Sequence, residues 1–275
     1  MGIFRRRTDR SEHGHSWFGL HRPFDPGYRL VTSGLISPFA LFLIRLLLAV
    51  WSVAASLAHI IYSQSVVKEY PFKQYFVYFT RLTYIGLTAY FCAAAFHSGF
   101  FVLSLRQLKK HEVSRAPWFP LQKWGKFLQF LHLTLFSSII TYPFIVTIVY
   151  WAFLADKETW SSPFKSWSNI SFHALNSVLV LVELIFGRVR LYLGYWITCI
   201  ILLALYLGMA YLVHSTQGIW VYGFLDPHKK NAKVAAYIVG IPVAETVVFI
   251  VIWGLIHMRD WIFPRAKGIR VVSTA

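Results

Sequence analysis

Long apolar runs alternate with short polar stretches along the whole chain. About 20 helical residues are needed to span the ~30 Å hydrocarbon layer of a bilayer. The sequence predicts six helices of this kind, over residues 37–62, 82–105, 127–154, 169–187, 191–214 and 234–258. We therefore predict an all-α fold, a polytopic membrane domain over residues 37–258 built as a bundle of six transmembrane helices.

The two ends of the chain are basic and polar. Residues 1–36 lack the apolar core of a cleavable signal peptide, and we expect them to form a disordered N-terminal tail. Residues 259–275 form a short basic C-terminal tail. The tails are expected to flank the membrane domain without folding as domains of their own.

Composition and charge support this interpretation. Of the 275 residues, 57% are hydrophobic and only 14% are charged, whereas a soluble domain carries about 25% charged residues. The net charge of +16 comes from Lys and Arg in the tails and short loops, with most of them in the tails and loop 106–126. The positive-inside rule then predicts that both termini are cytosolic.

This placement of charge in loops predicts the membrane and its lipids as partners and argues against nucleic acid, which would need a basic face. We expect an endomembrane, such as the endoplasmic reticulum, rather than the plasma membrane. Cys92 and Cys199 both lie inside apolar runs, which disfavours a disulfide framework or a zinc site. We expect no metal and no cofactor, and the oligomeric state is left open.

Polar residues inside the spans are the informative positions, because each needs a partner or a function in hydrocarbon. Thr83, Tyr90 and His97 recur every seven residues on the second span. The fourth span carries a second polar stripe: Asn169, His173, Asn176 and Glu183. Residues at these spacings share one helix face, so both stripes are expected to face the interior of the bundle.

Depth brings two of these side chains to the same level. The second and fourth spans both enter from the outer side, so Thr83 and His173 should lie near the same membrane surface. A threonine hydroxyl becomes a nucleophile only when a base removes its proton, and a histidine at equal depth could do so. The other threonines have simpler interpretations: Thr80 as a helix cap, and Thr88 bonded back to a carbonyl one turn earlier.

One pair of opposite charges is expected within the membrane. Arg45 on the first span and Glu183 on the fourth span fall at similar depth when ~1.5 Å is counted per residue from opposite entry points. We interpret them as a structural ion pair.

Three segments resemble the signatures of one family. They are RLTYIGL around Thr83, NISFHALNSVLVLVE from Asn169 to Glu183, and GIWVYGFL at 218–225. Together they resemble the androgen-induced protein and androgen-dependent TFPI-regulating protein family of multi-span membrane proteins. The resemblance implies a threonine hydrolase that cleaves the ester between a fatty acid and a hydroxy fatty acid. It places the functional threonine and histidine on Thr83 and His173.

The resemblance suggests further roles around this pair. A substrate drawn from the bilayer would be attacked by Thr83 while His173 takes its proton. Candidates for binding the substrate or the developing oxyanion are Asn169, Asn176, Trp220, Tyr222, Tyr90 and His214. Asp226 is the nearest candidate for a third catalytic acid, or it simply turns the chain before Pro227.

Two other functions fit parts of the pattern. The polar stripes could only hold helices together in a non-catalytic protein that binds lipids or sterols. Alternatively, two pairs of histidines, one toward each side of the membrane, could be axial ligands of two haems in an electron carrier. Those pairs would be His97 with His132, and His173 with His214.

Overall fold

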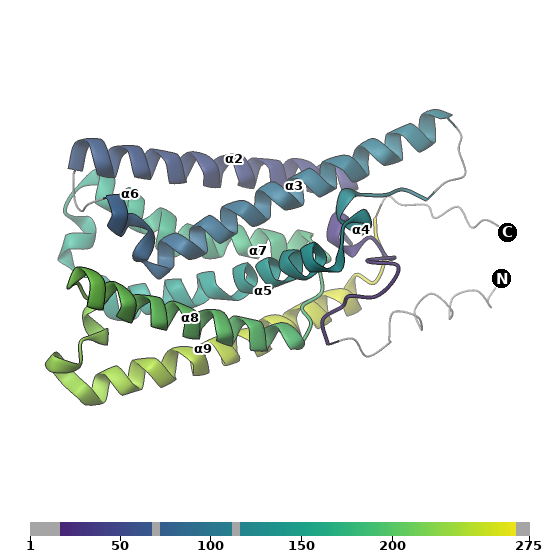
Figure 1. The fold of residues 1–275 in the computed structure, drawn as a ribbon. Coiled ribbons are helices and arrows are strands. Elements are labelled where there is room, and N and C mark those ends of the chain that lie inside the picture. The colour runs from purple at the N-terminus through teal and green to yellow at the C-terminus, as the bar shows by residue number, and fades with distance from the viewer. Residues whose placement is uncertain (1–16, 68–71, 112–115, 268–275) are drawn as a thin grey trace.

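The computed structural model describes residues 17–67, 72–111 and 116–267 and shows long helices that run side by side in one bundle (Figure 1). Six helices in these residues are long and apolar enough to cross a membrane. The described residues contain no strand. The predicted all-α fold with six membrane-spanning helices is confirmed.

The longest elements are α2 (Pro38–Tyr62), α3 (Phe79–His111), α5 (Lys126–Val149), α7 (Asn176–Phe186), α8 (Gly194–Gln217) and α9 (Pro227–Ile262). Two short helices complete the bundle, α4 (Pro120–Lys123) and α6 (Pro163–Ile170). A π-helical turn, Ser171–Leu175, joins α6 to α7, so these three elements together form the fourth span. Helix α5 occupies the centre, where it packs against α3, α7, α8 and α9.

Capping explains where several helices begin. An N-cap side-chain oxygen accepts a hydrogen bond from a first-turn amide, and proline favours the next position because its missing N–H is not needed there. The same device starts α2, α6 and α9, at Ser37-Pro38, Ser162-Pro163 and Asp226-Pro227. Asp226 is therefore a helix cap, which accepts from the amide of His228 at 3.0 Å.

Two helices extend beyond the apolar runs that predicted them. Helix α3 begins at Phe79, before the predicted start at 82, and continues to His111. Helix α9 likewise begins at Pro227, ahead of the predicted 234. Hydropathy identifies only the apolar part of a helix. The polar turns at the ends of these helices were therefore not included in the predicted ranges. As a consequence, Thr80 lies inside the first turn of α3 and is not its N-cap.

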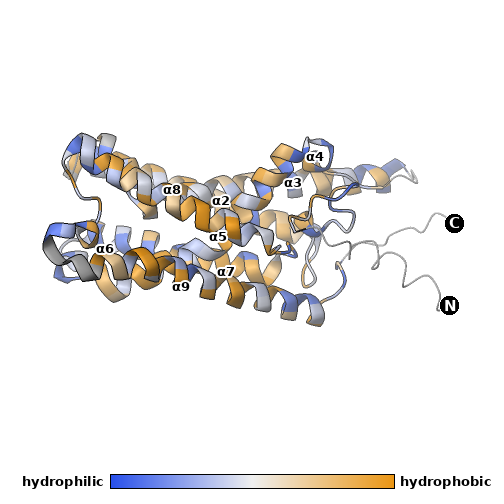
Figure 2. Cartoon of the chain, turned by 60° about the horizontal axis from the view of Figure 1, so that its bottom comes forward, coloured by the Kyte–Doolittle hydropathy of each residue, from blue (hydrophilic) through white to orange (hydrophobic). Residues whose placement is uncertain are grey.

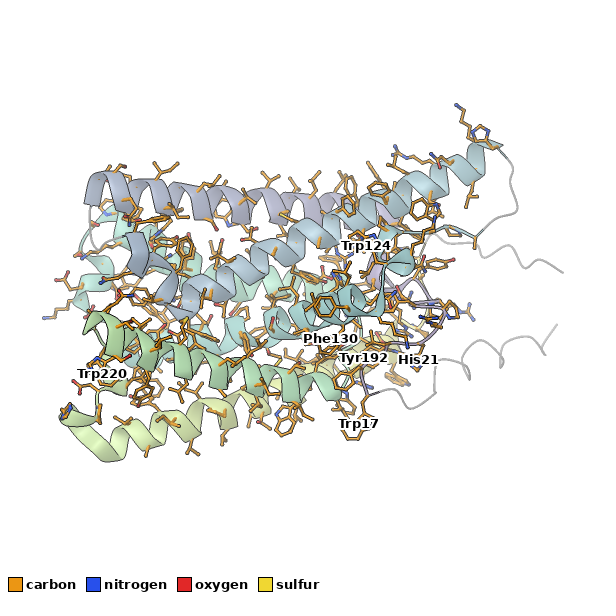
Figure 3. The ribbon with its side chains drawn as sticks, in the orientation of Figure 1. Trp17, His21, Trp124, Phe130, Tyr192 and Trp220 are labelled. Carbon is orange, nitrogen blue, oxygen red and sulfur yellow. The ribbon has the colours of Figure 1, made fainter. Side chains whose placement is uncertain are left out.

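The outer surface of the bundle is apolar. Figure 2 shows hydrophobic residues along the helices and hydrophilic residues gathered mainly toward their ends. Large apolar side chains such as Leu47, Leu205 and Val239 are 68%, 65% and 63% exposed. Aromatic side chains lie near both ends, Trp17 and Tyr192 at one and Trp220 at the other (Figure 3). This pattern is typical of a lipid-facing surface with aromatic belts at its edges.

A buried ion pair links the helices in the interior. The Nε and Nη2 atoms of Arg45 donate to the two carboxylate oxygens of Glu183, and both side chains are almost completely buried. Arg45 Nη1 donates to the Leu30 carbonyl and the Ser98 hydroxyl, each at 2.7 Å. The Tyr90 hydroxyl donates to Glu183 Oε1 at 2.9 Å. The ion pair expected from the sequence is thus present, and it connects α2, α3 and α7.

The segment before α2 is folded where it is described, in contrast to the expected disordered tail. Residues 1–16 of that tail lie outside the described residues. From Trp17 onward the chain packs across one end of the bundle, where Val31 is fully buried. The Trp17 carbonyl accepts from the amide of Gly194 at 3.0 Å, and Leu30 accepts from Arg45. Main-chain carbonyls of this segment thus satisfy buried groups of the bundle, a role that composition does not reveal.

The ion pair generates a prediction about stability. Replacing Glu183 by Ala leaves the buried Arg45 guanidinium without its counter-charge, which is expected to lower the free energy of unfolding by about 3–5 kcal/mol. Tyr90→Phe removes one hydrogen bond to the carboxylate and should cost less, about 1.5–3 kcal/mol. Denaturant unfolding in detergent measures both. Equal stability of Glu183→Ala and wild-type protein would contradict a structural role for the pair.

Candidate functional site

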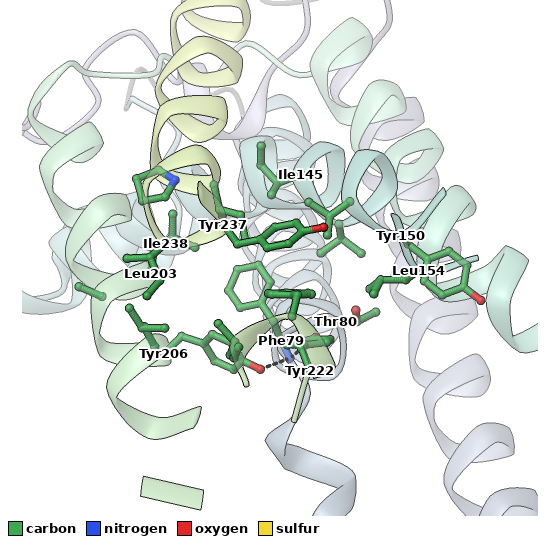
Figure 4. Close-up of a pocket in the computed structure, with 18 of the residues that line it drawn as sticks. Phe79, Thr80, Ile145, Tyr150, Leu154, Leu203, Tyr206, Tyr222, Tyr237 and Ile238 are labelled. Carbon is green, nitrogen blue, oxygen red and sulfur yellow. Dashed lines mark hydrogen bonds between the residues drawn. The ribbon is translucent and has the colours of Figure 1, made fainter. Parts of the chain in front are cut away.

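Two cavities meet near the end of the bundle that carries Trp220. The first, which we call the apolar slot, has a volume of about 260 Å³ and lies between α5, α8, α9 and the start of α3 (Figure 4). Its walls include Ile145, Leu203, Ile238 and Ile241. The second, which we call the polar vestibule, has a volume of about 580 Å³ and is bordered by α6, the 3-10 turn Lys157–Trp160 and the ends of α2 and α3. Four residues line both cavities: Thr80, Tyr150, Leu154 and Tyr222.

Thr80 and Tyr222 form the polar part of this boundary. The Tyr222 phenol oxygen accepts a hydrogen bond from the amide of Phe79 at 3.1 Å, and it interacts with the Thr80 side chain and main chain. The same amide lies 3.0 Å from the Tyr206 hydroxyl, which donates to the Val77 carbonyl. Two tyrosines thus occupy the N-terminal end of α3, where amide groups have no partner within the helix.

Burial raises the pKa of the Tyr222 phenol above its ordinary value of 10.0, although hydrogen bonds from Tyr206 and Thr80 act in the opposite direction. The phenol therefore keeps its proton at neutral pH. A protonated phenol at this boundary can donate a hydrogen bond to a group that lies beside Thr80.

His173 enters the vestibule from the π-helical turn between α6 and α7. Its ring stacks on the Tyr150 ring, with centroids 3.6 Å apart and planes 6° apart. Its carbonyl accepts from Trp151 Nε1 at 3.0 Å. The buried Nδ1 atom has no hydrogen-bond partner among the described residues. Isolated π-helical turns are frequent at functional sites, and here one presents an imidazole whose plane is fixed by stacking.

The structure does not bring Thr83 and His173 together. Thr83 lines a separate cavity of about 200 Å³ beside Gly86 and Tyr142, and its hydroxyl donates to the Thr80 carbonyl at 3.0 Å. Residues three apart on a helix differ in direction by about 60°, which is enough to turn Thr83 away from the vestibule. Thr80, one turn earlier on the same helix, does line the vestibule with His173.

Only two of the other candidate binding residues reach the site. Tyr222 lies at the boundary, and Asn169 lines the vestibule, where its amide donates to the Thr159 carbonyl at 3.2 Å. Asn176 is buried elsewhere and accepts from Thr147. The rest are engaged outside both cavities: Tyr90 bonds Glu183, and Trp220 and His214 stack on each other with centroids 3.7 Å apart.

The histidines do not support the two-haem alternative. His97 and His132 do lie together, with ring centroids 5.4 Å apart in an edge-to-face arrangement. They are packed among aromatic rings, those of Tyr90, Phe96, Phe119 and Trp124. His173 and His214 stack on Tyr150 and Trp220 respectively. Aromatic packing therefore accounts for the position of all four histidine rings.

Three residues of the vestibule were not predicted from the sequence. His59 on α2 and Arg81 on α3 lie at the ends of apolar runs, where polar side chains usually face solvent, yet His59 is only 1% exposed. Tyr150, whose ring stacks on His173, was not singled out by the sequence. Of the three, only Arg81 lies next to a residue that the sequence analysis considered, Thr80.

Comparisons with known proteins identify a family and no closer relative. No curated protein and no solved structure matches the chain. Residues 42–256 match the FAR-17a/AIG1-like protein family, which is the androgen-induced protein family that the three sequence segments resemble. The match begins within α2 and ends within α9, so it includes Thr80, His173 and Tyr222. Because it covers most of the chain, this multi-pass membrane protein belongs to the FAR-17a/AIG1-like protein family.

Proposed function

We propose that this protein is a lipid ester hydrolase in which Thr80 is the nucleophile and His173 the general base. The observation that supports this most strongly is the position of Thr80. Its side chain stands where an apolar slot meets a polar vestibule, and that vestibule also contains His173. A lipid ester likewise has an apolar part, the acyl chain, joined to a polar part, the ester carbonyl. The substrate class is the one implied by the family resemblance, a fatty acid esterified to a hydroxy fatty acid.

The apolar slot would hold the acyl chain. Its walls are aliphatic and aromatic, and they come from helices that also face lipid, such as α8 and α9. Ala204 lines the slot and is itself exposed on the outside of the bundle. A substrate could therefore enter sideways from the bilayer, acyl chain first, with its ester placed beside Thr80. We further propose an endomembrane location for this reaction, in keeping with a lipid substrate.

The first chemical step would form an acyl-threonine. His173 takes the proton from the Thr80 hydroxyl while its oxygen attacks the ester carbonyl. Negative charge then develops on the carbonyl oxygen, and the protonated phenol of Tyr222 is placed to donate a hydrogen bond to it. When the ester C–O bond breaks, the proton held by His173 passes to the leaving oxygen. The hydroxy acid is released with its alcohol restored.

The second step would regenerate the enzyme. A water molecule from the vestibule gives a proton to His173, and its oxygen attacks the acyl-threonine carbonyl. The bond to Thr80 breaks, the fatty acid leaves, and the proton returns from His173 to the threonine oxygen. Every proton is returned, so the cycle requires no cofactor. Stacking on Tyr150, instead of a third acidic residue, would hold the imidazole in place.

Substitution of the two threonines separates the two possible nucleophiles. Thr80→Ala removes the proposed nucleophile and is expected to lower kcat for a fatty acid ester of a hydroxy fatty acid by roughly 10²-fold or more, whereas Thr80→Ser retains a hydroxyl and measurable activity. Thr83→Ala is the matched control, since it removes a hydroxyl one turn away. Its kcat should stay near the wild-type value in purified, detergent-solubilised protein. Loss of activity in Thr83→Ala together with retention in Thr80→Ala would reverse the assignment.

Two histidine substitutions test the proposed general base. His173→Gln keeps a polar side chain of similar size but cannot carry the proton, and its kcat is expected to fall roughly 10²- to 10⁴-fold. His214→Gln is the control, because His214 is also stacked on an aromatic ring at the same end of the bundle and should be dispensable. Steady-state hydrolysis measured for both variants distinguishes them. Activity in His173→Gln equal to that of the control would exclude the proposed base.

A larger side chain in the wall of the apolar slot tests whether the acyl chain binds there. Ala204→Phe adds a phenyl ring to the wall of the slot, which should lower kcat/KM for esters of long-chain acids about tenfold relative to esters of butyric acid. Leu205→Phe is the control, because the adjacent Leu205 is 65% exposed toward lipid and lies outside the slot. A chain-length profile compares the two variants. An unchanged profile in Ala204→Phe would mean that the acyl chain binds elsewhere.

A further inference from the structure

Arg81 is a charged residue of the vestibule to which the hydrolytic steps give no role. It follows Thr80 on α3 and lines the same cavity as Thr80 and His173. Its guanidinium carbon lies 4.3 Å from the centroid of the Phe172 ring and 5.2 Å from that of Tyr75. Stacking of a guanidinium on aromatic faces is favourable and orients its donors. Arg81 is therefore held in place instead of moving freely in solvent.

A buried histidine fixes the guanidinium further. Arg81 Nη2 lies 2.8 Å from Nε2 of His59. Arginine can only donate hydrogen bonds, so Nε2 of His59 must accept, and the His59 proton is on Nδ1. His59 is packed against Phe164, with ring centroids 5.3 Å apart, and is 1% exposed. A neutral histidine thus positions Arg81 without cancelling its charge.

One nitrogen of the Arg81 guanidinium has no hydrogen-bond acceptor in the described part of the chain. Arg81 Nη1 is buried and has no hydrogen-bond partner among the described residues. An unsatisfied buried donor is costly, and more so when it is charged. A ligand that brings an acceptor to Nη1 would remove this cost. The favoured acceptors of a guanidinium are the paired oxygens of a carboxylate or phosphate.

The acidic residues of the vestibule are engaged elsewhere. The Asp156 carboxylate accepts from the amide of Thr159 at 3.2 Å, at the start of the 3-10 turn Lys157–Trp160. Glu158 forms an ion pair with Lys165, with Nζ 3.1 Å from Oε2. Among the described residues, neither carboxylate lies within 4.0 Å of the Arg81 guanidinium. The positive charge of Arg81 is therefore available to a group that enters the vestibule.

We propose that Arg81 binds the free carboxylate of an ester lipid, so that the enzyme selects acidic lipid esters over neutral ones. This inference rests on the proposed function, because it places the ester at Thr80 and the carboxylate at the next residue of the same helix. The acyl chain would occupy the apolar slot, and the hydroxy-acid half would lie in the vestibule with its carboxylate on Arg81. His59 is a positioning residue that holds Arg81.

The test compares an acidic substrate with its uncharged counterpart. A fatty acid ester of a hydroxy fatty acid and the methyl ester of that same molecule differ only in the carboxylate. Wild-type protein is expected to prefer the acid in kcat/KM by roughly tenfold or more, since hydrogen bonds to charged groups are the strong ones. Arg81→Gln should reduce this preference to near one, with the loss chiefly in KM for the acid. Arg81→Lys, which keeps the charge without the paired donors, should be intermediate.

A matched arginine controls for general effects of charge. Arg106 lies on the same helix, is exposed, and also stacks on an aromatic ring, with its guanidinium carbon 5.0 Å from the Phe39 centroid. It lies outside the vestibule, so Arg106→Gln should retain the wild-type preference. A preference that survives in Arg81→Gln, or that is absent from wild-type protein that hydrolyses both esters, would overturn the proposal.

A binding measurement separates this proposal from the hydrolase itself. An ether analogue of the acid cannot be hydrolysed, and its effect on the unfolding temperature of wild-type protein is compared with that of its methyl ester. The acid should stabilise wild-type protein more strongly than the methyl ester, and Arg81→Gln should remove the difference. If wild-type protein hydrolyses neither substrate but shows this difference, the hydrolase fails and the carboxylate site stands. Equal stabilisation by the two analogues would refute the carboxylate site.

Discussion

The buried ion pair of Arg45 and Glu183 is the interaction on which the rest of the structure depends. It joins α2 to α7, and through Tyr90 and Ser98 it fixes both to α3. Helix α7 continues through a π-helical turn to His173, and α3 begins with the turn that holds Thr80. The ion pair therefore sets the relation between the two elements that carry the proposed catalytic residues, although it lies away from both cavities. In hydrocarbon such a pair is stable because each charge has its counter-charge and further hydrogen bonds.

Arg45 and Arg81 differ in how far their hydrogen-bonding capacity is satisfied. Arg45 and Glu183 have partners on every side, as buried charges normally do. Arg81 and His173 are different, since each has a buried nitrogen without a partner among the described residues. Both line the polar vestibule, next to the apolar slot. Other buried polar atoms without a described partner, such as His97 Nδ1 and Arg188 Nε, lie outside the vestibule, so Arg81 and His173 are distinguished by their place beside the slot.

The sequence predicted the fold well because membrane physics leaves few choices. Six apolar runs required six helices, and opposite charges at equal depth required an ion pair. The site was only partly predictable. Depth along a helix follows from counting residues, and His173 does line one cavity with the start of α3. The direction of a side chain depends on where its helix begins and how it packs, and α3 begins before the predicted start. In the structure Thr80 lines the vestibule with His173, whereas Thr83 lines another cavity.

The central claim is that the hydroxyl of Thr80 attacks the substrate. A fluorophosphonate that reacts with activated hydroxyls would leave a stable adduct on the nucleophile of the purified protein. Digestion and mass spectrometry would then locate the modified residue within the peptide that contains both Thr80 and Thr83. The account predicts one phosphonate on Thr80, absent after His173→Gln substitution. An adduct on Thr83, or no adduct on any residue of a protein that hydrolyses ester lipids, would contradict it.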